Sequence, residues 1–371
     1  MNILIHGIST NMGGAKRHLN NMMFALGKRS DNNRYFVIVN DKYETPWESD
    51  KCKALRFPIA MSNGLKRIFF DNYYINKLIE DYEIDILISF ANFGPIKAKC
   101  KHILFEMNAL YFCKNIQPML TTKQRIDYSI KRSLIRLAGN NADLIVTPSE
   151  SLKILLYKSI GLDLKKIDVL HHAIEQNFNK DVEHITLAED DKTIFLYPSH
   201  LARHKGVDVL IDALTILKKK KPKNLKFKII CTFDRRDAPA YYDELMSKIE
   251  KENLDNIIVF TGHIPQNEIN KYYASADYMI YTTLCESFGF SMIEAKTFRL
   301  PALCSDIPIN REIAKKSARY YPPENSYALA DAIMEFVKNR PDDFDFNDDL
   351  INWDWQKYTS SLIKIIEKVS K

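Results

Sequence analysis

The amino-acid sequence predicts an α/β protein with two domains, each built on a parallel sheet that helices cover. Its 371 residues, 46% of them hydrophobic and 27% charged, have the length and composition of two globular domains. Short apolar runs alternate with helical patterns along the chain, which is typical of parallel sheets. The alternation starts again after Glu175, so a second domain of the same class is expected there.

The N-terminal half begins with an apolar run, residues 3–7, that leads into a glycine-containing loop and then into a helical pattern. The apolar residues of that pattern are spaced for one face of a helix: Leu19, Met22, Met23 and Leu26. Further runs of strand length are residues 35–39, 84–90, 103–105 and 144–146. This half is therefore expected to form the first sheet, in a domain of residues 1–175.

The second half follows a polar, acidic stretch without periodicity, residues 177–191, which we interpret as the connection between domains. A strand at 193–197, a loop at 198–206 and a helix at 207–218 come next. Further expected strands are residues 226–231, 257–260, 278–281 and 302–305. We place this second domain at residues 176–345. Residues 346–371 hold Trp353, Trp355 and Tyr358 and then an amphipathic helix, 361–369, which is expected to pack onto another part of the chain.

Composition excludes several classes of protein. No apolar stretch reaches the ~18 residues of a membrane-spanning helix, and the start has no secretion-signal pattern, so a cytoplasmic protein is expected. Six scattered cysteines form no CxxC pair or Cys/His cluster, so we expect no metal site. The net charge of +6 is uneven: residues 1–175 carry +8 and residues 176–371 carry −2, so the N-terminal half suits an anionic partner. Nucleic acid is disfavoured, because the basic residues are not interleaved with aromatic ones.

A first candidate site is the loop with Gly13, Gly14 and Arg17. Glycines let backbone amides approach a ligand, the following helix start favours an anion, and Arg17 adds a planar hydrogen-bond donor. A plain tight turn is the alternative. The loop lacks the GxGxxG pattern, so a dinucleotide cofactor, and with it a dehydrogenase, is disfavoured.

A second candidate site follows the first strand of the second half. One loop carries four basic or titratable residues: His200, Arg203, His204 and Lys205. Positive charge at the carboxyl end of a strand suits a diphosphate, although a solvated basic loop would look the same.

The third candidate site holds two carboxylates, Glu286 and Glu294, on either side of a predicted helix start. The backbone amides of residues 287–290 precede that helix and form another possible anion site. The two carboxylates could be an acid/base pair, but beside a phosphate site the binding of sugar and ribose hydroxyls is favoured. Either one alone could be a helix cap or a solvated charge.

Glu286 and Glu294, in the order Glu-x7-Glu, resemble the signature of the family 4 glycosyltransferases, also called glycosyl transferases group 1. Other segments fall in the order of that family: 13–17, 142–149, 205–206, 260–262 and 305–308. The resemblance implies the GT-B fold: two Rossmann-like domains facing across a cleft, with a C-terminal helix that returns to the N-terminal domain. It also implies that residues 1–175 are the acceptor side and that residues 176–345 bind a nucleotide sugar.

The resemblance implies a role for each motif. Glu294 binds ribose hydroxyls, Glu286 holds the transferred sugar near its anomeric carbon, and Lys205 neutralises the diphosphate. The expected residues that bind the sugar donor are Gly13, Gly14, Arg17, His200, Arg203, Lys205, His263, Ile264, Glu286, Ser287, Phe288, Gly289, Phe290 and Glu294. The expected catalytic residues are Glu286, Lys205, Glu106 and Asn108. No cofactor is implied, and members of the family need no metal.

Four departures from the family pattern stand out. His200 replaces a usual arginine, which shifts phosphate binding onto Lys205 and Arg203. Residues 105–108 lack a usual histidine, so Glu106 and Asn108 become candidates for the acceptor-side group. Ser287 and Arg299 each stand where glycine is common.

The predicted activity is retaining, hexosyltransferase-type transfer from a nucleotide-diphosphate sugar to a hydroxyl. The expected acceptor is a lipid-linked oligosaccharide in the synthesis of a bacterial surface polysaccharide such as lipopolysaccharide. Residues 123–137 combine basic and apolar residues in a helical pattern that suits peripheral contact with an anionic membrane on its inner, cytoplasmic face. A helix packed on the core is the alternative for that segment. The alternative activities are a nucleotide-sugar 2-epimerase of the same architecture and a noncatalytic nucleotide-sugar-binding member of the family.

Overall fold

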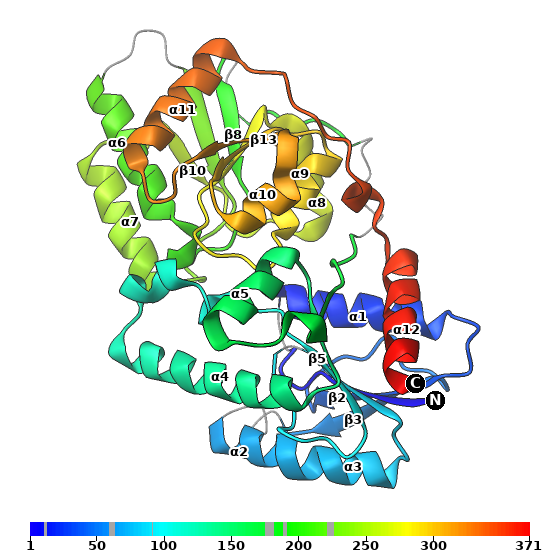
Figure 1. The fold of residues 1–371 in the computed structure, drawn as a ribbon. Helices are drawn as coiled ribbons and strands as arrows, with labels where there is room; N and C mark the ends of the chain where they lie inside the picture. The colour runs from blue at the N-terminus through cyan, green and yellow to red at the C-terminus, as the bar shows by residue number, and fades with distance from the viewer. Residues whose placement is uncertain (11–12, 59–63, 91, 175–181, 188–190, 221–225) are drawn as a thin grey trace. The chain divides into compact units, whose positions relative to one another are not determined.

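The structure is a computed structural model that describes residues 1–10, 13–58, 64–90, 92–174, 182–187, 191–220 and 226–371. The chain divides into two compact units, whose elements Figure 1 labels. The N-terminal unit consists of Met1–Cys113, Leu120–Ala173 and Trp353–Lys371, and the C-terminal unit of Lys114–Met119 and Ile174–Asn352. The expected boundary after residue 175 and most of the expected connection lie outside the described residues.

The described part of the N-terminal unit contains a seven-stranded parallel sheet in the order β3-β2-β1-β4-β5-β6-β7. Its strands are β1 (Asn2–His6), β2 (Arg34–Asn40), β3 (Cys52–Phe57), β4 (Ile86–Ser89), β5 (Lys101–Phe105), β6 (Leu144–Thr147) and β7 (Ile167–Val169). Five of them lie where apolar runs predict strands, which confirms the parallel α/β class. Strands β3 and β7 were not predicted.

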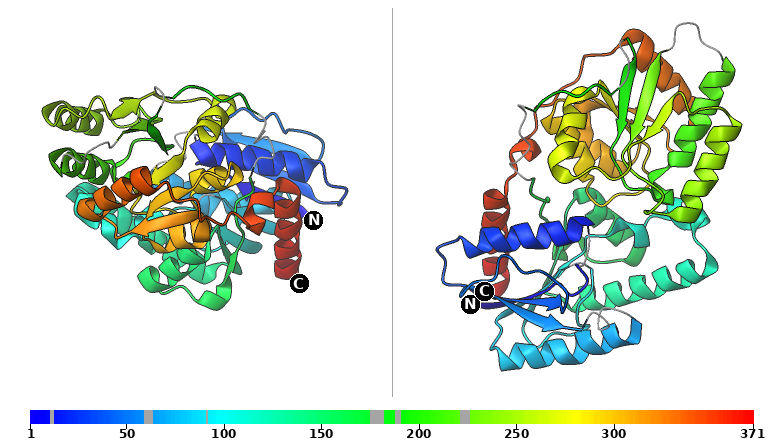
Figure 2. Two further views of the ribbon diagram at one scale, coloured as in Figure 1. Left: turned by 90° about the horizontal axis from the view of Figure 1, so that it is seen from above. Right: turned by 180° about the vertical axis from the view of Figure 1, so that it is seen from behind.

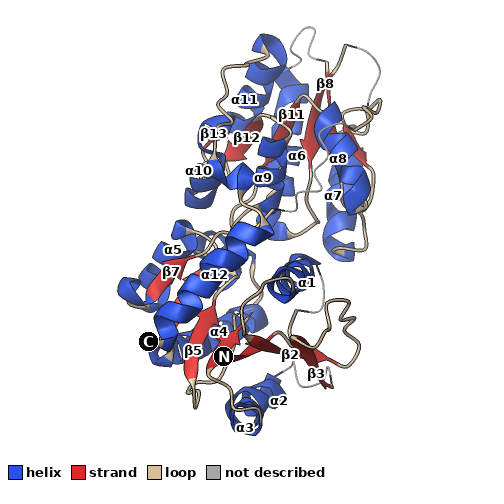
Figure 3. Cartoon of the chain, turned by 90° about the vertical axis from the view of Figure 1, so that its right-hand side faces the viewer, coloured by secondary structure: helices blue, strands red, loops and turns tan. Residues whose placement is uncertain are grey.

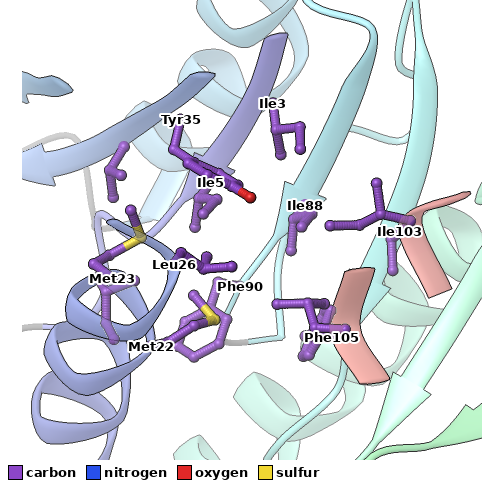
Figure 4. Close-up of a cluster of buried hydrophobic side chains, with 14 of the residues drawn as sticks. Ile3, Ile5, Met22, Met23, Leu26, Tyr35, Ile88, Phe90, Ile103 and Phe105 are labelled. Atoms are coloured by element: carbon purple, nitrogen blue, oxygen red, sulfur yellow. The ribbon is translucent and has the colours of Figure 1, made fainter. Parts of the chain in front are cut away.

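Helices cover both faces of this sheet, as Figure 3 shows for α1 with α12 on one side and α2 with α3 on the other. The α-helices are α1 (Gly13–Gly27), α2 (Gly64–Phe69), α3 (Ile75–Asp81), α4 (Thr122–Asn141), α5 (Glu150–Ile160) and α12 (Trp355–Ser370). A π-helical turn, η2 (Phe70–Tyr74), joins α2 to α3, and two 3-10 turns are η3 (Ala109–Tyr111) and η5 (Leu164–Lys166). Figure 4 shows the core between α1 and the sheet, where Met22 and Leu26 lie against strand residues such as Ile5 and Ile88.

The C-terminal helix α12 belongs to the N-terminal unit, as the resemblance implies. Its buried side chains Leu362 and Ile366 join the same core as α1, and His18 Nε2 lies 3.0 Å from the Tyr358 hydroxyl. The helix begins at Trp355, six residues before the expected start, because the Asp354 side chain accepts a hydrogen bond from the amide of Lys357 and caps it.

The described part of the C-terminal unit contains a six-stranded parallel sheet in the order β10-β9-β8-β11-β12-β13. Its strands are β8 (Thr193–Tyr197), β9 (Phe227–Cys231), β10 (Ile258–Phe260), β11 (Tyr278–Tyr281), β12 (Ala302–Ser305) and β13 (Ala318–Tyr321). The first five confirm the predicted strands, and β13 was missed.

Two separate apolar clusters lie on the two faces of this sheet. The right-hand view of Figure 2 shows the helices that cover the sheet, seen from the side opposite to Figure 1. The α-helices are α6 (Val207–Lys220), α7 (Pro239–Lys251), α8 (Gln266–Ser275), α9 (Phe290–Thr297), α10 (Pro308–Ala314) and α11 (Ser326–Asn339). The 3-10 turns are η4 (Lys114–Met119), η6 (Arg203–Lys205), η7 (Lys315–Ser317) and η8 (Asp349–Asn352). Arg299, between α9 and β12, has a φ of +55°, the left-handed region that favours glycine. This backbone geometry explains why glycine is common at that position of the family pattern.

In the described part of the chain, no helix is both long enough and apolar enough to span a bilayer.

Candidate functional site

The strand order of the C-terminal sheet selects one edge for a ligand site. Strands β8 and β11 are neighbours, and the order of the sheet runs in opposite directions from this pair. Open parallel sheets bind ligands at the carboxyl ends of the strands at such a point. The loop after β8 carries Lys205, and the loop after β11 carries Glu286. The topology therefore brings the second and third candidate sites of the sequence together.

Lys205 and Glu286 form a nearly buried ion pair between Nζ and Oε1. The backbone of Lys205 is fixed as well, because its carbonyl oxygen accepts hydrogen bonds from the Tyr197 hydroxyl at 2.6 Å and from Thr282 Oγ1 at 2.7 Å. Gly206 follows with a φ of +69°, and a Cβ at this position would lie 2.4 Å from the carbonyl oxygen of Thr282. A glycine is therefore required for the loop to hold Lys205 against β11.

The carboxylate of Glu286 receives further hydrogen bonds from its own segment. The Tyr281 hydroxyl donates to Oε1 at 2.8 Å, and Thr283 Oγ1 lies 3.5 Å from the same oxygen. Burial alone raises the pKa of Glu286, but the charge of Lys205 and the hydrogen bonds from Lys205 and Tyr281 outweigh this effect and hold the pKa below its ordinary value. The side chain is therefore ionised at neutral pH, as a carboxylate that accepts hydroxyl groups must be.

The two histidines of the loop after β8 do not add to its positive charge. Burial, together with the nearby charge of Lys205, lowers the pKa of His200 and lowers that of His204 to about 4. Both rings are therefore mainly neutral at pH 7. Arg203 points to another partner: its guanidinium binds Glu244 at 2.5 Å and stacks 4.4 Å from the centre of the Tyr241 ring. Of the four residues predicted to bind a diphosphate, Lys205 is the one that contacts Glu286.

Glu294 lies in the second turn of α9, nine-tenths buried, and its Oε2 accepts a hydrogen bond from the Tyr273 hydroxyl at 2.8 Å. Helix α9 begins at Phe290, one residue earlier than expected, after Gly289, whose φ of +87° suits only glycine. Ser291 ties this helix start to the loop after β8 through a 2.8 Å hydrogen bond to the carbonyl of Pro198. The N-terminal amides of α9 and the segment of Ser287 and Phe288 thus lie at the same sheet edge as Lys205.

His263 and Ile264 follow β10, which is the edge strand of the sheet and lies two strands away from β8. The structure does not bring these two residues into contact with the Lys205–Glu286 pair. Gly262 turns the chain there with a φ of +77°.

Three of the N-terminal candidate residues lie in a helix rather than in a loop. Helix α1 begins at Gly13, so Gly13 and Gly14 form its first turn, with Arg17 in the next turn. Residues 11–12, which complete the expected glycine-containing loop, lie outside the described residues.

Glu106 and Asn108 follow β5 at the carboxyl edge of the N-terminal sheet. The Glu106 side chain is fully buried; Oε1 accepts a hydrogen bond from the amide of Asn108 at 3.1 Å, and Oε2 has no partner among the described residues. Burial raises the pKa of Glu106 well above its ordinary value, so this carboxyl keeps its proton to a higher pH than an exposed glutamate does. Asn108 caps η3 by accepting a hydrogen bond from the amide of Leu110 at 2.9 Å.

Sequence reasoning missed three tyrosines that hold the predicted residues: Tyr197, Tyr273 and Tyr281. A tyrosine that ends a predicted strand directly before a charged motif is the signal that could have identified Tyr197 and Tyr281. Among the described residues, no group of three or more His, Cys, Asp or Glu side chains is arranged to hold a metal ion.

Comparison with curated proteins gives relatives that are named as a mannosyltransferase and as a synthase. The chain is 22% identical over 257 residues to the O-antigen chain mannosyltransferase RfbU of Salmonella typhimurium, covering 69% of this chain and 68% of that protein. It is 25% identical to the alpha-monoglucosyldiacylglycerol synthase of Streptococcus pneumoniae, covering 58% of this chain and 49% of the synthase.

Comparison with solved structures shows the fold. The structure of Anabaena Alr3699/HepE in complex with UDP-glucose matches with a TM-score of 0.70 and 16% identity, covering 99% of this chain and 100% of that one. The sucrose-phosphate synthase of Thermosynechococcus elongatus matches with a TM-score of 0.72 and 14% identity, covering 100% of this chain and 99% of that one. These likenesses confirm the GT-B fold class.

The family model for glycosyl transferases group 1 matches residues 179–352, which include Lys205, Glu286 and Glu294. Through this match residues 179–352 are assigned to the group 1 glycosyl transferases.

Proposed function

We propose that this chain is a retaining glycosyltransferase that moves a sugar from a nucleotide-diphosphate donor to a hydroxyl group. The observation that carries this proposal is the contact between Lys205 and Glu286 at the carboxyl ends of β8 and β11. This contact puts two complementary groups side by side. The lysine suits a diphosphate, and the ionised carboxylate suits sugar hydroxyls.

In this proposal each group acts on a defined part of the sugar donor. The Lys205 amine and the N-terminal amides of α9 stabilise the negative charge that develops on the departing diphosphate. Glu286 accepts hydrogen bonds from hydroxyls of the transferred sugar, and Glu294 accepts them from the ribose. The buried carboxyl of Glu106 is the candidate group on the acceptor side.

The names of relatives suggest which acceptors to test. One relative is named for the O-antigen chain and another for glucosyldiacylglycerol, and the structure of the lipopolysaccharide outer core galactosyltransferase WaaB matches with a TM-score of 0.69. We therefore propose a lipid-linked oligosaccharide acceptor in the synthesis of a bacterial surface polysaccharide.

A lipid-linked acceptor requires contact with a membrane, and α4 supports such contact. The apolar residues Ile126, Ile130 and Leu137 of this helix are 58%, 54% and 47% exposed. The helix carries one acidic residue, Asp127, which pairs with Lys131 at 2.7 Å. Its basic side chains are Lys123, Arg125, Lys131, Arg132 and Arg136. Exposed apolar residues among basic ones complement an anionic lipid surface.

A second exposed apolar row runs along α2 and η2 of the same unit. Leu65, Phe69 and Tyr73 follow one another at intervals of four residues and are 84%, 56% and 57% exposed. The rings of Phe69 and Tyr73 stack 5.2 Å apart, and Lys66 is the exposed charged residue of α2 and η2. This row has the same apolar and basic character as α4, so we include it in the proposed membrane surface.

Cosedimentation with vesicles tests the membrane surface. We expect binding to vesicles that contain phosphatidylglycerol and none to vesicles of phosphatidylcholine alone. At about 1 kcal/mol per basic residue near the surface, reversing three charges lowers binding about 100-fold or more. The test variant combines Lys123→Glu, Arg125→Glu and Arg136→Glu, and the control is Tyr327→Ser, which changes an exposed apolar residue of the C-terminal unit. Equal binding to both kinds of vesicle would contradict the charge argument.

Thermal stability in the presence of UDP, GDP, ADP, CMP and dTDP tests the sugar-donor site. Binding to the native state stabilises it by RT ln(1 + [L]/Kd), so the preferred nucleotide raises the melting temperature most. Sugars of that nucleotide are then assayed for transfer, with Lys205→Ala as the control that loses the shift. No shift with any nucleotide would contradict the proposal, and a shift without transfer to any acceptor would favour a noncatalytic binding protein.

A further inference from the structure

We infer that Tyr281 is the positioning residue of Glu286: its hydroxyl holds the carboxylate in place when Lys205 turns to the diphosphate. This inference rests on the proposed function and extends it to a residue outside the Glu-x7-Glu motif. Tyr281 is 2% exposed, so we assign it an action through Glu286 rather than a contact with the sugar donor.

All hydrogen bonds to the Glu286 carboxylate within the described residues converge on one oxygen. Oε1 receives the Lys205 amine and the Tyr281 hydroxyl, with Thr283 Oγ1 at 3.5 Å. Oε2 accepts no hydrogen bond from any residue that the structure describes. The three groups therefore orient the carboxylate and leave its second oxygen available for a hydroxyl group.

The two strong partners of Oε1 differ in mobility. Lys205 reaches Oε1 through a flexible four-carbon chain, and its amine is the group that a diphosphate attracts. Tyr281 is the last residue of β11, is 2% exposed and packs in the apolar cluster on the face of α9. Its ring has few torsions to change, and burial raises the pKa of its hydroxyl well above the ordinary value, so it remains a hydrogen-bond donor at neutral pH.

A displaced Lys205 amine would leave Glu286 without its ion pair. A nearly buried carboxylate without a partner is costly and tends to take up a proton. The other charged or titratable groups that face Glu286 are His200 and His204, both with lowered pKa values, and the phenol of Tyr197. Since neither histidine supplies a positive charge at pH 7, the Tyr281 hydroxyl is the fixed group that keeps Glu286 ionised and oriented.

The first test needs no sugar donor. The substitution Tyr281→Phe keeps the ring and removes the hydroxyl. In the full chain labelled with ¹³C at the glutamate carboxyl carbon, Glu286→Gln identifies the Glu286 signal, and a pH titration gives its pKa. The hydrogen bond from Tyr281 stabilises the charged form of Glu286. Its loss is therefore expected to raise the pKa of Glu286 by about one unit. Tyr278→Phe on the same strand, whose hydroxyl donates to the carbonyl of Pro341 at 3.3 Å, is the matched control and leaves the pKa unchanged. An unchanged pKa of Glu286 in Tyr281→Phe would overturn the inference.

The second test separates positioning from a merely structural effect. With the nucleotide sugar that the thermal screen selects, Tyr281→Phe is expected to lower kcat/KM about 10- to 100-fold, while the affinity for the free nucleoside diphosphate stays within about twofold. Equal loss of affinity for the nucleotide sugar and for the nucleoside diphosphate would show a general disturbance of the site and overturn the inference. If no nucleotide binds the unaltered chain, the proposed function fails, and the titration still decides whether Tyr281 controls Glu286.

Discussion

The buried carboxyl of Glu106 makes a sharp prediction about how stability depends on pH. Its folded-state pKa is raised by burial, so the folded chain keeps a proton that the unfolded chain releases above about pH 4.5. The stability associated with this group is therefore complete at acid pH and falls by about 1.4 kcal/mol per pH unit until the pH reaches the folded-state pKa. Glu106→Gln keeps the carbonyl that accepts the hydrogen bond from Asn108 and carries no titrating proton. The variant is therefore expected to gain stability relative to the unaltered chain as the pH rises from 4.5 to 8.

Melting temperatures of the full chain, measured in half-unit steps over this range, test the prediction. The control is Glu83→Gln, which changes an exposed carboxyl group of the same unit. The difference between the Glu106 variant and the unaltered chain should widen with pH, whereas the difference for the Glu83 variant should stay flat. A difference that is constant with pH for Glu106→Gln would show that Glu106 is ionised in the folded chain and refute the reasoning.

Three further predictions concern the C-terminal unit. Lys205→Met leaves Glu286 as a nearly buried carboxylate without its ion pair, so we expect a loss of about 3–5 kcal/mol of stability in denaturant unfolding; a loss below 1 kcal/mol would contradict this. Gly206→Ala places a Cβ 2.4 Å from the carbonyl oxygen of Thr282 at a positive φ, so a loss of about 1–3 kcal/mol is expected, and an unchanged melting temperature would contradict the geometry. Glu294→Ala removes hydrogen bonds to ribose worth about 2–3 kcal/mol, which corresponds to about 30- to 150-fold weaker nucleoside diphosphate binding by calorimetry. Unchanged affinity would remove Glu294 from the site.

The strands that the sequence misses share one place in the sheet, although one edge strand, β10, is predicted. Interior strands such as β8 and β11 are buried along their whole length and appear as continuous apolar runs. The three missed strands, β3, β7 and β13, are all edge strands. An edge strand is partly exposed, so polar residues such as Lys53 and Arg319 interrupt its apolar pattern. Exposure along one edge therefore hides these strands from a search for apolar runs.

The candidate site was predictable where its chemistry depends on residue type and order, and unpredictable where it depends on burial. Lys205 and Glu286 stand in recognisable motifs, and the sheet topology brings those motifs together. The neutral state of His204 depends on burial beside Lys205, which the order of residues does not reveal. Tyr281 lies in an apolar run, so it passes for a core residue until the structure shows where its hydroxyl points.

The place of α12 in the core of the N-terminal unit has a consequence for folding during synthesis. Residues Trp353–Lys371 leave the ribosome after the whole C-terminal unit, yet Tyr358, Leu362 and Ile366 fill the face of the N-terminal core beside α1. The C-terminal unit is contiguous apart from Lys114–Met119. While this unit is synthesised and folds, the nascent N-terminal unit therefore has an apolar face that α12 does not yet cover. The order of synthesis thus makes the first unit to emerge the last to be completed, and exposes its unfinished face to chaperones for the time that translation of residues 174–352 takes.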